Sequence, residues 1–120
     1  MHKEVEIEKW FVTRVKQLHA ISIKLSFASY LGSAGWPDRL LIVPRNKERG
    51  TQTAFYFVEL KTLKGKLTKR QKLRHEQLDY CGCNVITLYG MDETVTWLQL
   101  IADFHQLGSA PKPTCDLTSN

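Results

Sequence analysis

The chain has 120 residues and a mass of 13.8 kDa, which suits one domain with a core of its own. Apolar residues make up 42% and charged residues 24%, values that exclude wholesale disorder. The net charge of +5 permits a polyanionic partner such as nucleic acid but does not establish one.

The first half of the chain predicts one helix and two short strands. Lys3–His19 carries apolar residues at spacings of three and four, typical of an amphipathic helix. Ile21–Ala28 alternates apolar and polar residues, which predicts a half-buried strand. Residues 32–37 form a loop with two glycines and a proline, and Asp38–Val43 is the next strand.

The second half predicts two strands and two helices. A polar loop over residues 44–53 precedes a strand at Ala54–Thr62, whose apolar residues on both faces indicate a central position in the sheet. A helix at Thr68–Tyr80, a strand at Cys83–Tyr89 and a helix at Met91–Phe104 follow.

The predicted order is therefore α-β-β-β-α-β-α. The strand–helix–strand unit predicts a right-handed parallel crossover, and the earlier strands can form an antiparallel meander with it. The fold class is α/β, a mixed sheet flanked by helices. We expect one domain over residues 1–106, followed by a surface-hugging or disordered tail over 107–120 that contains two prolines and lacks periodicity.

Two charged residues stand at the end of the central strand. Glu59 and Lys61 project from the same face, about 7 Å apart, because side chains alternate along a strand. Their burial is costly unless they pair or bind something. An exposed strand end is the plainer alternative, and Glu-x-Lys alone is a weak signal.

Asp38 strengthens the case for a functional site. It follows Pro37 and opens its own strand, so its carboxylate can lie beside Glu59 at the sheet edge, although Pro-Asp is also a common turn dipeptide. Two carboxylates suit a hard cation such as Mg²⁺, which activates water and polarises a phosphodiester. Lys61 can orient the water, and the Leu60 carbonyl can add a metal ligand.

One-signed charge marks the segment after this strand. Residues 61–74 contain seven Lys or Arg residues and no acidic residue, which favours a phosphate-facing surface over a solvated helix face of mixed charge. Four of these residues are predicted to contact phosphates beside the site. They are Lys64, Lys66, Lys69 and Arg70.

Three segments together resemble a known family. Gly35-Trp-Pro-Asp-Arg-Leu-Leu41, Phe57-Val-Glu-Leu-Lys-Thr62 and Gly65-Lys-Leu-Thr-Lys-Arg-Gln71 are similar to the VRR-NUC branch of the PD-(D/E)xK nucleases. The resemblance implies a restriction-endonuclease-like fold, with Asp38, Glu59 and Lys61 as the core catalytic residues. It also implies a Mg²⁺ cofactor for which Mn²⁺ can substitute.

The family pattern adds a glutamate on the first helix and a glutamine on the second. Glu8 is the favoured metal-binding glutamate and Glu4 the second choice, while a role for both in the helix dipole stays open. Gln71 matches the glutamine, but Thr68-x-x-Gln71 also has the form of a capping box. His75, one turn later, can reach the same cleft, although a lone His is more often structural.

The resemblance implies a homodimer that acts on branched DNA such as four-way junctions, in the cytoplasm of a bacterial or phage-infected cell. A two-fold dimer also supplies the two sites that symmetric cutting requires. The alternatives are a non-catalytic nucleic-acid-binding module, a sequence-specific restriction-type enzyme and a structural protein without a ligand. No apolar run is long enough for a signal peptide or a membrane span, so we expect no membrane association.

Overall fold

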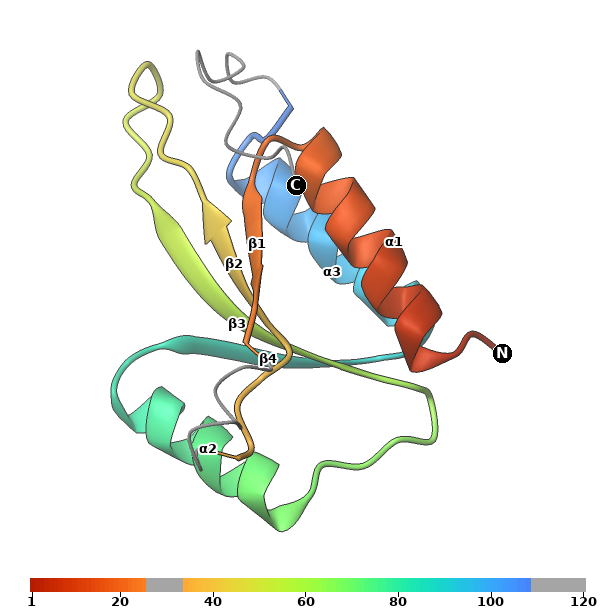
Figure 1. Ribbon diagram of the computed structural model, residues 1–120. Coiled ribbons are helices and arrows are strands. Elements are labelled where there is room, and N and C mark those ends of the chain that lie inside the picture. Colours follow the sequence, from red (N-terminus) through yellow and green to blue (C-terminus); the bar gives the residue numbers. More distant parts are fainter. Residues whose placement is uncertain (26–33, 109–120) are drawn as a thin grey trace.

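A computed structural model describes residues 1–25 and 34–108 of the chain (Figure 1). Within these residues seven elements follow one another in the predicted order α-β-β-β-α-β-α. They are α1 (Glu4–Gln17), β1 (Ile21–Lys24), β2 (Arg39–Val43), β3 (Ala54–Lys61), α2 (Lys69–Tyr80), β4 (Asn84–Tyr89) and α3 (Gly90–Phe104). The end of the first expected strand (residues 26–28) and the whole 109–120 segment lie outside the described residues.

The four strands form one mixed sheet in the order β1-β2-β3-β4. Pairings β1–β2 and β2–β3 are antiparallel, and β3–β4 is parallel with α2 as the crossover. The predicted meander, the parallel crossover and the central position of β3 are all confirmed. Among the described residues no helix is long and apolar enough to cross a membrane.

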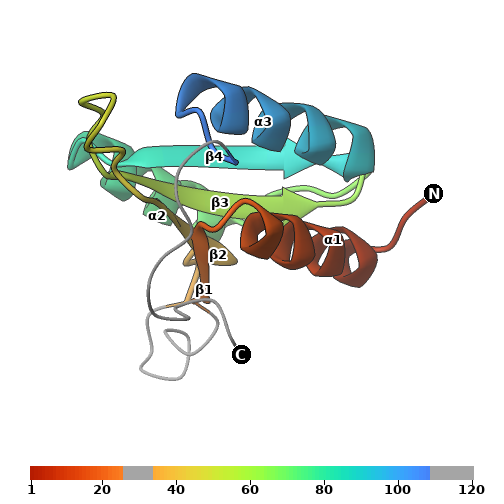
Figure 2. The same cartoon turned by 90° about the horizontal axis from the view of Figure 1, so that it is seen from above.

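Helices cover the sheet on both faces (Figures 1 and 2). The pair α1 and α3 lies on one face and in mutual contact, and α2 lies on the other face against β4. The main core lies under α1 and α3. Its fully buried members include Ile7, Phe11, Val15, Leu41, Val58, Leu60, Leu88 and Leu98.

Alternation along β3 decides what lies on each face. Val58 and Leu60 point into the core beneath α1 and α3. Phe57, Glu59 and Lys61 therefore point to the opposite face, which carries α2. The strand thus buries its apolar side and presents charge on the side of the crossover helix.

Candidate active site

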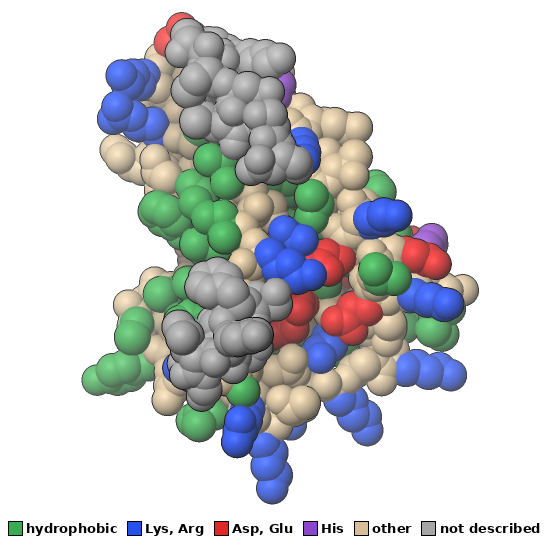
Figure 3. Space-filling view, in the orientation of Figure 1, with side chains coloured by type: hydrophobic (Ala, Val, Ile, Leu, Met, Phe, Trp, Pro, Cys, Tyr) green, Lys and Arg blue, Asp and Glu red, His purple; other side chains and the backbone are tan. Residues whose placement is uncertain are grey.

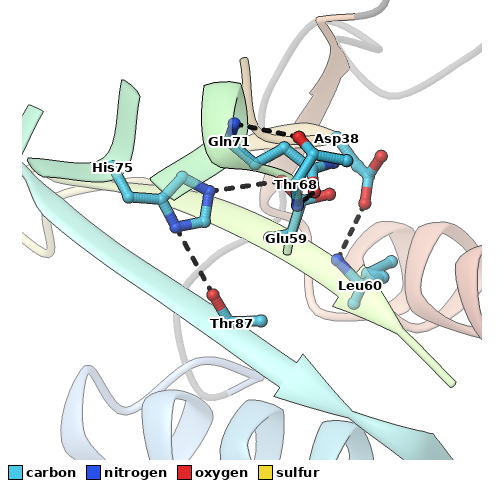
Figure 4. A network of polar contacts seen from close by, with 7 residues as sticks. All are labelled: Asp38, Glu59, Leu60, Thr68, Gln71, His75 and Thr87. Carbon is cyan, nitrogen blue, oxygen red and sulfur yellow. Dashed lines mark hydrogen bonds and ion pairs between the residues drawn. The ribbon is translucent and has the colours of Figure 1, made fainter. Parts of the chain in front are cut away.

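Asp38 lies directly beside Glu59. Arg39 pairs with Val58, so the register of the antiparallel pair places the preceding residue, Asp38, opposite Glu59. The Leu60 N–H donates a 2.8 Å hydrogen bond to Asp38 Oδ2 (Figure 4). This bond fixes one carboxylate oxygen of Asp38 to the backbone of the central strand.

Glu59 is a buried carboxyl group among other charges. Its side chain is 1% exposed. Burial raises the pKa of Glu59 to about 9, helped by a side-chain hydrogen bond and repulsion from Asp38 and opposed by the Lys61 cation. A carboxyl group in this position holds its proton at neutral pH, so the metal-free site carries less negative charge than its composition suggests.

Lys61 belongs to the same electrostatic cluster. It lowers the pKa of Glu59 and of Glu4 and, as a like charge, also contributes to lowering the pKa of His75. The structure therefore brings Asp38, Glu59 and Lys61 together as the sequence predicted. Their catalytic roles stay predictions.

His75 contacts Glu59 from α2. Its Nε2 lies 3.2 Å from Glu59 Oε1, and its Nδ1 lies 3.5 Å from Thr87 Oγ1 on β4. Burial, and then the Lys61 cation, lower the pKa of His75, so the imidazole is neutral at pH 7. When Glu59 is ionised it only accepts hydrogen bonds, which places the ring hydrogen on Nε2 and makes the Thr87 hydroxyl the donor to Nδ1.

If Glu59 binds a metal ion, as the sequence predicts, removing the His75 hydrogen bond should weaken that binding. Groups that orient a metal-binding carboxylate typically contribute about 10- to 100-fold in metal affinity or activity. We expect His75→Leu to lose cleavage by roughly that factor, chiefly through a higher Mg²⁺ requirement, whereas His75→Gln keeps a donor and retains more activity. Cleavage measured against Mg²⁺ concentration tests this. An unchanged Mg²⁺ requirement in a folded His75→Leu protein would contradict it.

The two candidate glutamates of α1 lie in different environments. Glu8 Oε2 accepts a 2.9 Å bond from Arg39 Nε, and Lys24 Nζ lies 3.9 Å from Glu8 Oε1. Arg39 is the neighbour of Asp38 in the strand, so it points to the opposite face, under α1. Glu8 is therefore held by two cations on the face away from Glu59.

Glu4 is electrostatically linked to the acidic cluster. Its pKa is raised by partial burial, then by repulsion from Asp38 and, less, from Glu8, while Lys61 opposes this shift. Glu4 also contributes to the raised pKa of Glu59. Glu4, the second choice from the sequence, thus interacts with the Asp38–Glu59 pair more directly than the ion-paired Glu8 does.

Gln71 caps the start of α2. Thr68 Oγ1 accepts from the Gln71 N–H at 3.1 Å, and Gln71 Oε1 accepts from the Thr68 N–H at 2.9 Å. The capping box is therefore present. Gly35, in the loop that leads to Asp38, packs against the backbone of residues 70–71 and so holds this helix start against that loop. A catalytic role for Gln71 stays a prediction.

The predicted phosphate contacts lie on the surface, in the segment between β3 and α2 and in the first turn of α2. Lys64, Lys66, Lys69 and Arg70 are all exposed. Figure 3 shows Asp and Glu side chains gathered in the middle of this face, with Lys and Arg side chains around them. An acidic centre surrounded by basic side chains suits a polyanion when a cation neutralises the centre.

The carboxylates of Asp38 and Glu59 are the two side chains that suit a magnesium ion. No group of three or more His, Cys, Asp or Glu side chains is arranged as a metal site in residues 1–25 and 34–108. Mg²⁺ is usually held by one or two carboxylates and keeps several waters, so Asp38 and Glu59 meet its needs. Burial, with the neighbouring Asp38, makes an ionised Glu59 costly, and a cation held between the two carboxylates would offset that cost.

Comparison with solved structures identifies the fold. A structure described as "VRR_NUC domain" superposes with a TM-score of 0.66 at 29% sequence identity, over 82% of this chain and 97% of the other. The chain has a VRR-NUC fold. A second structure, described as "VRR_NUC domain protein", matches with a TM-score of 0.60 at 19% identity, over 85% of this chain and 89% of its own, and supports the fold alone.

The structural match confirms the resemblance inferred from the sequence. VRR-NUC domains are a nuclease family, and the match spans nearly the whole of the first structure. No protein-family model matches the sequence, and no curated protein sequence is significantly similar to it. The evidence for the similarity to VRR-NUC domains therefore consists of the three short sequence motifs and the fold.

Proposed function

We propose that this chain is a metal-dependent endonuclease that hydrolyses phosphodiester bonds in DNA. The observation that carries the proposal is the buried Glu59 carboxyl group beside Asp38 and Lys61, at the end of the central strand of a nuclease-family fold. Burying the Glu59 carboxyl group beside a second, half-buried carboxyl group is costly for a purely structural protein. It is useful to a protein that binds a cation there.

Asp38, Glu59 and the Leu60 carbonyl would hold the metal ion, with Mg²⁺ as the expected ion and Mn²⁺ as a substitute. When bound, the ion supplies an activated water and charge stabilisation at the phosphate. Lys61 orients the water and offsets negative charge that develops on the phosphate. His75 keeps Glu59 in place, and Lys64, Lys66, Lys69 and Arg70 hold neighbouring phosphates.

Glu4 is proposed as the helix α1 residue that completes the site, in place of Glu8. We expect Glu4→Gln to lower cleavage about tenfold or more, because Glu4 acts on both Asp38 and Glu59. Glu8→Gln should leave the Mg²⁺ requirement unchanged and only weaken the ion pair with Arg39. Cleavage rates of both variants at several Mg²⁺ concentrations decide between them. A larger loss in Glu8→Gln would reverse the assignment.

Branched DNA is the proposed substrate, with the four-way junction as its representative, and the proposed active form is a homodimer. Two copies related by a two-fold axis would place two sites in a fixed relation, as paired cutting of a junction requires. The nuclease domain would span residues 1–106, with 107–120 as a tail. Such an enzyme would act in the cytoplasm of a bacterial or phage-infected cell.

The substrate test compares labelled four-way junction, flap and linear duplex DNA under identical conditions. Faster cutting of the junction, with paired cuts and a dimer in solution, would support the proposal. Equal rates on all three DNAs would leave a nuclease without structure selectivity. Binding to all three without cutting, with Mg²⁺ or Mn²⁺, would favour the non-catalytic binding module instead.

A further inference from the structure

A small pocket lies beside α2. It has a volume of about 220 Å³ and is lined by Ala34 and by one face of the helix. The lining residues of that face follow the spacing i, i+3, i+4, i+7. They are Arg70, Leu73, Arg74 and Gln77.

Arg74 is held in a fixed position at this pocket. Its guanidinium lies 4.8 Å from the centre of the Trp36 ring, and its Nη1 donates a 3.0 Å hydrogen bond to Gln77 Oε1. Its Nε is buried and has no hydrogen-bond partner. Within the part of the chain that the structure describes, neither Arg70 nor Arg74 forms an ion pair.

Two arginines at one pocket, without a carboxylate to balance them, favour an anionic ligand. The Arg74 Nε–H is closed to solvent, so the feature that attracts an anion is the positive charge of the two guanidinium groups. Guanidinium groups match phosphate oxygens in geometry and charge. The Trp36 ring already packs against Arg74 and, with a centroid separation of 6.1 Å, against Phe57, so it is not free to stack a base. Phosphate is therefore the chemical group that the pocket suits.

The chain connects this pocket directly to the proposed active site. Trp36 lies two residues before Asp38, and Arg74 is followed by His75, which contacts Glu59. We propose that Arg70 and Arg74 bind one backbone phosphate of the DNA strand, adjacent to the phosphodiester that is cut. The inference rests on the proposed function, because it takes DNA as the ligand.

The pocket can be tested by binding alone, with wild-type chain and variants in EDTA so that no DNA is cut. The probe is a fluorescent four-way junction, and the measured quantities are Kd and its dependence on salt concentration. Arg74→Gln and Arg70→Gln are each expected to weaken binding about tenfold. Each should also reduce the slope of log K against log salt by about 0.9 for each pocket that is occupied, the value for one duplex phosphate.

Arg49→Gln is the matched control, since Arg49 is an exposed arginine in the loop between β2 and β3. It should change the slope by much less than either pocket variant. Arg70 is itself exposed, so Arg70→Gln remains informative even where Arg74→Gln fails to fold. Equal slopes for wild type and Arg70→Gln would contradict phosphate binding at the pocket. So would a change in slope for Arg49→Gln as large as that for the pocket variants.

Neutral methylphosphonate substitutions near the cut site give the position of the contact. Substitution at several phosphates should weaken wild-type binding, but at one of these positions the same substitution should have little further effect in Arg74→Gln. Additive effects at every position would overturn the inference while leaving DNA binding intact. A chain that binds no DNA at all would instead refute the proposed function along with it.

Discussion

Glu59→Gln is expected to abolish DNA cleavage while making the metal-free protein more stable. Loss of one of two metal-binding carboxylates should reduce the cleavage rate by at least about a hundredfold. Gln has nearly the same shape and no charge to bury, so it removes the repulsion between Glu59 and Asp38. Function and stability therefore oppose each other at this position.

The stability gain should depend on pH in a defined direction. The unfolded chain releases the Glu59 proton near the ordinary pKa of 4.5, while the folded chain holds it until about 9. The folded state binds more protons between these values, so wild-type stability falls as pH rises from about 4.5 to about 9. Since each pKa unit is worth about 1.4 kcal/mol, we expect Glu59→Gln to gain on the order of 1–3 kcal/mol at pH 7.

Urea unfolding of both proteins at pH 5, 7 and 9 in EDTA measures this gain. The difference between Glu59→Gln and wild type should grow from pH 5 to pH 9. Glu48→Gln, in an exposed loop, serves as the control and should show no such growth. Equal stability of Glu59→Gln and wild type at every pH would show that ionising Glu59 in the folded protein costs no free energy and that its pKa is not raised.

Gly35→Ala is expected to cause a large loss of stability. Gly35 has φ +94°, and a Cβ there would lie 2.5 Å from the Arg70 carbonyl oxygen and 2.7 Å from its carbon. Both atoms belong to the backbone of α2, so neither can move aside cheaply. We expect the free energy of unfolding to fall by about 2–4 kcal/mol, the sum of backbone strain and overpacking.

Gly50→Ala separates the two causes. Gly50 also has a positive φ of +70°, but nothing lies within 4 Å of its added Cβ. The free energy of unfolding of Gly50→Ala should therefore fall only by the backbone strain, about 1 kcal/mol. Urea unfolding of both variants gives the comparison. Equal losses would show that the loop before Asp38 does not pack on α2 as the structure describes.

The fold was predictable because the pattern along each segment agrees with its environment. The apolar residues on both faces of β3 follow from its central position in the sheet, and the Thr68–Gln71 capping box marks the start of α2. The convergence of Asp38 and Glu59 was predictable for the same reason, since neighbouring antiparallel strands bring their facing residues together.

The choice between Glu4 and Glu8 could not be made from the sequence. Both lie on one side of α1, and the helix period alone does not show which carboxylate meets a cation of the sheet. The contact behind our proposal of Glu4, the ion pair of Glu8 with Arg39, depends on α1 packing on the face to which Arg39 points. His75 was equally undecided, because its contact with Glu59 depends on the distance between α2 and the sheet.

The most direct test of the central claim is cleavage of labelled DNA by wild type and Lys61→Ala, each with Mg²⁺ and with EDTA. The account predicts cutting by the wild type with Mg²⁺ alone, and a loss of at least about a hundredfold in a Lys61→Ala protein that still folds and binds DNA. Cutting that survives EDTA, or a Lys61→Ala protein as active as wild type, would contradict a metal-dependent nuclease built on Asp38, Glu59 and Lys61.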